Sequence, residues 1–160
     1  MLLLNLPLTV GAAKQGDAPI TVEADRLEIN QQTGVSIYQG NVRLQQDTLL
    51  LQAQRLELHS TEGQVQKAYA EGSPVHLEHE DTETGMTTRA EASHMEYRLS
   101  DGVMELKGDA RLWRGRDEFS GNHLIYDTDN NVVKAFGDTE KDDKGRVRVI
   151  LQPKEDDTDE

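Results

Sequence analysis

The 160-residue chain has no cysteine, only two Phe and one Trp, and far fewer basic than acidic side chains. The absence of cysteine excludes disulfides, thiolate metal sites and cysteine nucleophiles. A net charge of −13 argues against nucleic-acid binding, which depends on Lys and Arg neutralising phosphates, and against adsorption to anionic membrane surfaces. The scarcity of aromatic residues favours a thin, aliphatic interior built from sheets.

The N-terminal residues 1–13 are apolar and end in small residues, as do the hydrophobic region and cleavage site of a secretory signal peptide. No basic region precedes them, so an irregular N-terminal strand is the alternative. Asn5 and Pro7 interrupt the run, which is too short to cross about 30 Å of hydrocarbon as a helix. Residues 14–19 read as a linker, and residues 152–160 as an acidic disordered tail.

From Ile20 onward, apolar and polar residues alternate in short segments, a pattern typical of half-buried strands. Gly, Asn and Asp separate these segments and cut every candidate helix to fewer than about 12 residues. We therefore expect an all-β domain over residues 20–151. If each glycine ends a strand, the domain has about 14–16 short antiparallel strands.

One frame of residues recurs four times, starting at Ala24, Ala53, Ala92 and Gly121. The first copy is ADRLEINQQTGVSIYQGNVRL: a small residue, apolar residues at alternate positions, a turn with Gly, and a second Gly before two more apolar residues. The steps of about 29, 39 and 29 residues indicate internal repeats that stack as supersecondary units. Each copy has one apolar face, which only its neighbours and a facing sheet can bury.

The pattern A-x-x-L-x-[IY], turn, Gly, two apolar residues, then G-[ND]-[VA]-x-[LV] resembles the OstA-like family of periplasmic lipopolysaccharide-transport proteins. The segments that carry it are Ala24–Leu27 with Gly40–Leu44, Ala92–Tyr97 with Gly108–Leu112, and Phe119–Asp127. The likeness covers residues 19–137. It implies a twisted β-jelly roll, an elongated antiparallel sandwich whose two sheets leave an apolar groove for the acyl chains of lipopolysaccharide.

The resemblance further implies a non-enzymatic periplasmic carrier and bridge that passes lipopolysaccharide from the inner to the outer membrane and uses no cofactor. Its ligand is the lipid A part, inner- and outer-membrane transport proteins dock at its two ends, and copies stack head to tail. The same domain occurs within both of those partners. The absence of a long anchor helix and the chain length favour the periplasmic component. A ligand-free scaffold between envelope complexes is the alternative, and a β-solenoid polysaccharide-active enzyme is a weaker one.

The inward positions of the alternation are the candidate groove residues, with ordinary core packing as the alternative for each of them. They are Ile20, Val22, Leu27, Ile37, Val42, Leu44, Leu49, Leu51, Leu58, Leu77, Met95, Tyr97, Leu106, Leu112, Phe119 and Tyr126.

Arginines flank Trp113 and are candidates for contacts with head-group phosphates, or else solvated surface charges: Arg111, Arg114 and Arg116. No catalytic motif is recognisable: the chain has no Gly-x-Ser-x-Gly elbow and no phosphate-binding glycine loop. His76 and His79 are three residues apart and face opposite sides of a strand, so we expect no metal site there.

Overall fold

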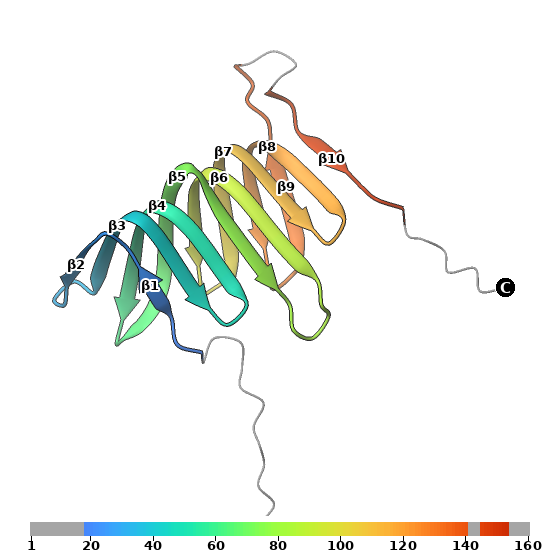
Figure 1. Ribbon diagram of the computed structural model, residues 1–160. Helices are drawn as coiled ribbons and strands as arrows, with labels where there is room; N and C mark the ends of the chain where they lie inside the picture. Colours follow the sequence, from blue (N-terminus) through green and yellow to red (C-terminus); the bar gives the residue numbers. More distant parts are fainter. Residues whose placement is uncertain (1–17, 141–144, 154–160) are drawn as a thin grey trace, which may run out of the picture.

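A computed structural model describes residues 18–140 and 145–153. Its strands are β1 (Thr21–Glu23), β2 (Arg26–Asn30), β3 (Val35–Gln46), β4 (Leu49–Thr61), β5 (Gln64–Glu80), β6 (Thr87–Arg98), β7 (Val103–Arg114), β8 (Asp117–Asp127), β9 (Val132–Phe136) and β10 (Arg148–Ile150). They form one antiparallel sheet (Figure 1), which confirms the all-β prediction. No helix in the described part of the chain is long and apolar enough to cross a membrane. The predicted signal peptide (1–13) and most of the predicted acidic tail lie outside the described residues.

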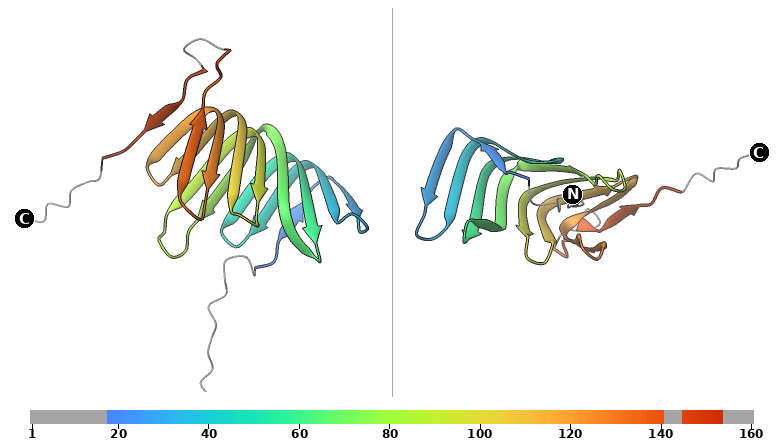
Figure 2. Two further views of the ribbon diagram at one scale, coloured as in Figure 1. Left: turned by 180° about the vertical axis from the view of Figure 1, so that it is seen from behind. Right: turned by 90° about the horizontal axis from the view of Figure 1, so that it is seen from below.

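The sheet folds over along one line, which we call the ridge. The pairing register of β3–β8 shifts near the middle of each strand, for example between Gln39 and Val42 and between Lys107 and Ala110. Such bulges bend a strand and increase its twist. The strands therefore arch over the ridge and return on its other side (Figures 1 and 2). Each of the strands β3–β8 therefore contributes one half to each of two layers. The first layer contains β1, β10 and the halves of β3–β8 on their side of the ridge. The second layer contains β2, β9 and the other halves.

Glycines at the ridge bend strands that continue beyond them. Gly40 and Asn41 have φ of 80° and 46°, and Gly108 and Asp109 have φ of 82° and 46°, so each pair forms a left-handed bulge. A Cβ atom on Gly108 would lie 2.8 Å from Ser93 Oγ, so a side chain there would clash as well as strain the backbone. The predicted number of 14–16 short strands is therefore wrong, because the second glycine of each of the first three frames (Gly40, Gly72 and Gly108) lies within a strand rather than at its end. The described residues contain ten strands instead.

Both edges of the sheet are interrupted at the ridge. β1 and β2 pair with the two halves of β3, and β9 and β10 pair with the two halves of β8. At the first edge, the Asp25 N–H donates a hydrogen bond of 2.9 Å to the Gly40 carbonyl, which holds the broken strand against the bulge. Short edge strands limit, without removing, the capacity of a sheet to pair with another chain.

Small residues lie across from the bulges. Ala53 pairs with Val42, Ala92 with Val75, and Gly121 pairs opposite a bulged strand in the same way. These three small residues begin three of the four repeated frames in the sequence. The largest fully buried side chains lie on both sides of the ridge: Leu56, Leu106, Leu112, Leu124, Val42 and Val75. The most completely buried large side chains of the described residues therefore flank the ridge.

Candidate functional site

The inner face of the folded sheet carries one continuous apolar row in each layer. The first row crosses the first layer from edge to edge through Val22, Leu44, Leu51, Leu77, Ala90, Leu112, Phe119 and Val149. The second row crosses the second layer through Leu27, Tyr38, Leu56, Ala70, Met95, Leu106, Leu124 and Ala135. Cross-strand partners point to the same side of a sheet, so both rows face the space between the layers.

A third row runs farther from the ridge in the second layer. It consists of Ile29, Ser36, Leu58, Ala68, Tyr97, Met104, Tyr126 and Val133, and only Ser36 in it lacks an apolar or aromatic side chain. Within the described ranges, no polar or charged residue is buried. The three rows thus present an almost wholly apolar surface along the interior, and none of their residues is both charged and buried.

Burial within these rows falls from the middle of the sheet towards its edges. Leu106 and Leu112 are completely buried, whereas Leu27 and Ile29 at the first edge are 51% and 55% exposed. At the other edge, Val149 is 46% exposed. The apolar interior therefore reaches solvent at both ends of the molecule.

Most of the predicted groove residues lie on these rows. On the first row are Val22, Leu44, Leu51, Leu77, Leu112 and Phe119. On the second and third rows are Leu27, Met95, Leu106, Leu58, Tyr97 and Tyr126. Val42 lies at the ridge, Leu49 packs against the core near the tip of the first layer, and Ile20 precedes β1 with 36% exposure. Contact of these residues with a lipid stays a prediction.

The inward orientation predicted for Ile37 is wrong. Ile37 pairs with Glu28 and Glu57, and this row continues through Tyr69 on the outer face. The inward residue of this strand segment is Tyr38, which packs against the buried core. The error arises because the outer face of the second layer carries some apolar residues of its own, so hydrophobicity alone does not identify the inner one.

Sequence reasoning also missed the small members of the rows. Ala70, Ala90 and Ala135 occupy the same inner positions as the leucines beside them. Ala135 lies two residues from the inward Val133 in its own strand, so alternation could have identified it. No inward Leu, Val or Phe lies an even number of residues from Ala70 or Ala90 within the same strand segment, so only the pairing with neighbouring strands identifies these two.

The structure does not bring the three predicted head-group arginines together. Arg111 pairs with Glu91 and Ser120 on the outer face of the first layer, and Arg116 is exposed in the turn between β7 and β8. Arg114 lies on the inner face, two residues beyond Leu112. Only Arg114 therefore borders the apolar interior.

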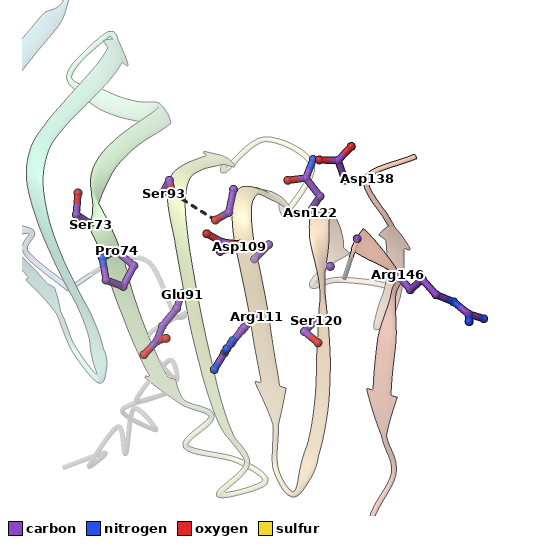
Figure 3. A pocket seen from close by; sticks show the side chains of 14 residues that line it. Ser73, Pro74, Glu91, Ser93, Asp109, Arg111, Ser120, Asn122, Asp138 and Arg146 are labelled. Atoms are coloured by element: carbon purple, nitrogen blue, oxygen red, sulfur yellow. Dashed lines mark hydrogen bonds between the residues drawn. The ribbon is translucent and has the colours of Figure 1, made fainter. Parts of the chain in front are cut away.

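A polar trough of about 710 Å³ lies on the outer side of the ridge. Figure 3 shows Glu91, Ser93, Asp109 and Arg111 along it, with Arg146 at its far side. The Ser93 hydroxyl donates to the Gly108 carbonyl at 3.4 Å and so supports the bulge. The trough is thus built from the groups that shape the ridge, and we take the apolar interior as the candidate site.

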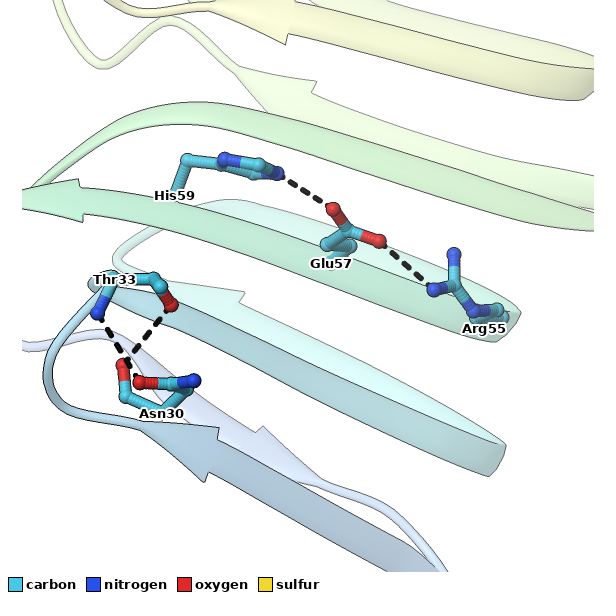
Figure 4. Close-up of polar contacts among 5 residues, drawn as sticks. All are labelled: Asn30, Thr33, Arg55, Glu57 and His59. Atoms are coloured by element: carbon cyan, nitrogen blue, oxygen red, sulfur yellow. Dashed lines mark hydrogen bonds and ion pairs between the residues drawn. The ribbon is translucent and has the colours of Figure 1, made fainter.

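On the outer face of the second layer, glutamates such as Glu57 form ion pairs with neighbouring basic side chains. Glu57 accepts hydrogen bonds from His59 Nε2 at 2.6 Å and from Arg55 Nη2 at 2.8 Å (Figure 4). These two bonds, the one to His59 first, hold the pKa of Glu57 below its ordinary value against the opposing effect of burial. Figure 4 also shows the nearby β2–β3 turn, where Asn30 Oδ1 accepts a bond from the Thr33 N–H. The outer face is therefore charged where the inner face is apolar.

The histidines considered for a metal site lie on opposite faces of β5. His76 is on the outer face with its Nδ1 3.1 Å from Glu91 Oε1, whereas His79 pairs with Thr88 in the inner register. In the part of the chain that the structure describes, no group of three or more His, Asp or Glu side chains is arranged to hold a metal ion.

Comparison with known proteins gives concordant matches. A family model described as "LptA/(LptD N-terminal domain) LPS transport protein" matches residues 21–132. The chain is 24% identical over 155 residues to the lipopolysaccharide export system protein LptH of Pseudomonas aeruginosa, covering 94% of this chain and 89% of the relative. It is 27% identical over 139 residues to the lipopolysaccharide export system protein LptA of Escherichia coli K12, covering 86% of this chain and 72% of the relative.

A solved structure shares the fold. The crystal structure of LptH, described as the LptA-homologous periplasmic component of the conserved lipopolysaccharide transport device from Pseudomonas aeruginosa, matches with a TM-score of 0.77 at 23% identity. The match covers 88% of this chain and 100% of that chain. The elongated folded sheet is therefore an architecture already observed by crystallography.

Proposed function

Because the chain belongs to the LptA/(LptD N-terminal domain) family of lipopolysaccharide transport proteins, we propose that it is a non-enzymatic carrier and bridge for lipopolysaccharide. It acts in the periplasm and passes the lipid from the inner to the outer membrane. The acyl chains of lipid A lie along the apolar interior, between the first row and the second and third rows.

The observation that carries this proposal is the continuity of the apolar rows from one edge to the other. Each methylene group moved from water into such an interior contributes about 0.8 kcal/mol, so several acyl chains supply ample binding free energy. Because the three rows contain no buried charged residue and only Ser36 among them is a small polar one, neighbouring positions along the rows are chemically alike. The acyl chains then gain little from staying at any one position along the rows, which suits a carrier that must pass its ligand onward.

The two edges of the sheet support the proposal that the protein bridges the two membranes. Large apolar side chains are exposed at both edges, among them Leu27 and Ile29 at the first and Val132 and Val149 at the last. The two edges differ in sequence, so contact between them is head-to-tail and propagates into a filament. The same edges accept a strand from an inner-membrane or an outer-membrane transport protein by β-augmentation.

Photo-crosslinking at three tyrosines tests the lipid position. Tyr38 and Tyr97 are on the inner face, whereas Tyr69 is on the outer face of the same layer. Replacing each in turn by p-benzoylphenylalanine keeps the aromatic ring, so the three variants are closely matched. We expect irradiation with lipopolysaccharide to give a lipid adduct at Tyr38 and Tyr97 and little at Tyr69. Equal adducts at all three positions would contradict the proposal.

A ligand-free scaffold is the second candidate, and the packing at the ridge favours it. Leu56, Leu106 and Leu124 are fully buried by other parts of the chain, so side chains already fill the interior around them. A scaffold of this kind still associates through its ends. It predicts no lipid adduct at Tyr38 or Tyr97 under conditions where the protein forms head-to-tail oligomers, which separates it from the carrier.

A further inference from the structure

Arg114 is the one lysine or arginine that the described strands place on the inner face. Its inner position follows from its pairing with Thr88 and Asp117, two residues beyond the completely buried Leu112. Every other Lys or Arg in these strands alternates with an inward residue and so lies on an outer row: Arg26, Arg43, Arg55, Lys67, Arg89, Arg98, Lys107, Arg111, Lys134 and Arg148.

The Arg114 side chain reaches from the first layer to the second at the open side of the sandwich. Its Nη2 donates a hydrogen bond of 3.1 Å to Asn131 Oδ1, in the turn between β8 and β9. Its guanidinium carbon lies 5.5 Å from the centre of the Tyr126 ring, a cation–π geometry. Arg114 therefore stands where the apolar rows meet solvent.

The hydrogen-bonding capacity of this guanidinium is only partly used. Its Nε is buried and has no hydrogen-bond partner within the described residues, and its recorded hydrogen bonds go to Asn131 and, at 3.5 Å, to the sulfur of Met86. Asp117 lies directly across the strand pair, yet the two form no ion pair in the described structure. The positive charge is thus held by neutral groups, which leaves it available to an anion.

We propose that Arg114 binds a phosphate group on the head of the lipid whose acyl chains lie in the interior. This inference rests on the proposed carrier function and names a polar contact for it. An amphiphile with its chains between the layers places its head group at the open side, where Arg114 is. The planar guanidinium bonds two phosphate oxygens at once, which a lysine does not reproduce. The acidic surface elsewhere repels such a head group, so a single inner cation selects its position.

The test is a set of binding titrations with hexa-acylated lipid A in its diphosphoryl form and in the monophosphoryl form of the same acylation. For the wild-type protein we expect about tenfold tighter binding of the diphosphoryl lipid, the size of one charge-assisted contact. Arg114→Gln is expected to bind both lipids equally, and Arg114→Lys to keep part of the preference. Arg111→Gln, on the outer face of the same strand, is the matched control and keeps the wild-type preference.

Three results would overturn the inference while leaving the carrier function intact. One is an unchanged preference in Arg114→Gln. Another is an equal loss of affinity for both lipids together with a lowered Tm, which would make Arg114 a brace between the layers. The third is displacement of lipid A by millimolar inorganic phosphate, which would indicate a site for free anions. Failure of the wild-type protein to bind either lipid would instead overturn the proposed function, and this inference with it.

Discussion

Apolar side chains on the inner face are buried beside the ridge and exposed at the edges of the sheet. Leu106, beside the ridge, is completely buried, whereas Leu27, on the same row at the first edge, is 51% exposed. Burial of an apolar side chain stabilises the fold, whereas an exposed one at an edge contributes little until a neighbouring molecule covers it. The residues that stabilise the fold and those that we propose for association therefore lie at different points of one continuous row.

Truncation beside the ridge is expected to have the largest effect on stability. Leu106→Ala removes a completely buried side chain and leaves a cavity, which costs about 2–5 kcal/mol of the free energy of unfolding. Ile29→Ala at the edge, where the side chain is 55% exposed, should cost less than about 1 kcal/mol. Urea unfolding followed by circular dichroism measures both. Similar losses in the two variants would contradict the contrast between ridge and edge.

The ridge glycines come next. Gly108→Ala forces a Cβ to 2.8 Å from Ser93 Oγ at a φ of 82°, and we expect a loss of about 2–3 kcal/mol from strain and repacking. Gly63, in the turn between β4 and β5, has a φ of 75° and nothing within 4 Å of an added Cβ. Gly63→Ala isolates the backbone cost alone, about 1 kcal/mol. Equal losses by thermal unfolding would show that the bulge tolerates a side chain.

A comparison of the first and second glycines of the repeated frames shows what the sequence could not predict. Gly34 and Gly102, the first glycines of their frames, do mark turns, as expected. The second glycines, Gly40 and Gly108, also look like turn residues in the sequence, since Asn41 and Asp109 follow them. Each bulge is supported by a partner distant in the sequence: the N–H of Asp25, in the break between β1 and β2, donates to the Gly40 carbonyl, and the hydroxyl of Ser93 in β6 donates to the Gly108 carbonyl. That partner is set by the tertiary register, which local pattern does not contain.

The candidate site was partly predictable, for a related reason. Alternation correctly placed residues such as Leu44 and Met95 on the inner face, because strands fix side-chain direction at every second residue. It failed at Ile37, where the outer face is locally apolar as well. Once Leu112 is known to point inward, the same alternation places Arg114 on the inner face. Without the strand register, the sequence does not distinguish Arg114 from Arg111 and Arg116.

The edges should control self-association. Ile29→Asp and Val149→Asp each place a charge where the native side chain is 55% or 46% exposed, so the stability of the monomer should change by no more than about 1 kcal/mol. Head-to-tail contact should weaken at least about tenfold, because burying an unpaired carboxylate is costly. Sedimentation velocity over a range of concentrations measures this. Leu99→Asp, at a turn and 39% exposed, is the matched control and should associate as the wild type does.

A strictly monomeric wild-type protein over that range would refute self-stacking. The exposed apolar residues at the edges would then serve only to dock other transport proteins.

The smallest expected effect concerns pH and compares outer-face glutamates near the ridge and at the edge. Lys107 Nζ, 3.0 Å from Glu105 Oε1, and His123 Nε2, 2.7 Å from the same oxygen, hold the pKa of Glu105 below its ordinary value of 4.5, while partial burial opposes them. A carboxylate with a lowered pKa stabilises the fold fully above pH 4.5, and this contribution disappears as the pH falls through the lowered pKa. Glu105→Gln should therefore lose less than about 1 kcal/mol at neutral pH.

The difference between wild type and Glu105→Gln should vanish in acid, because a protonated glutamate and a glutamine are then nearly equivalent. Glu28→Gln is the control: Glu28 lies on the same outer row but in the edge strand β2, and no ion pair of it is found in the described structure. Its replacement should change stability by a similar small amount at every pH. Urea unfolding at a series of pH values separates the two variants, and a difference for Glu105→Gln that persists undiminished in acid would show that packing, not charge, sets its contribution.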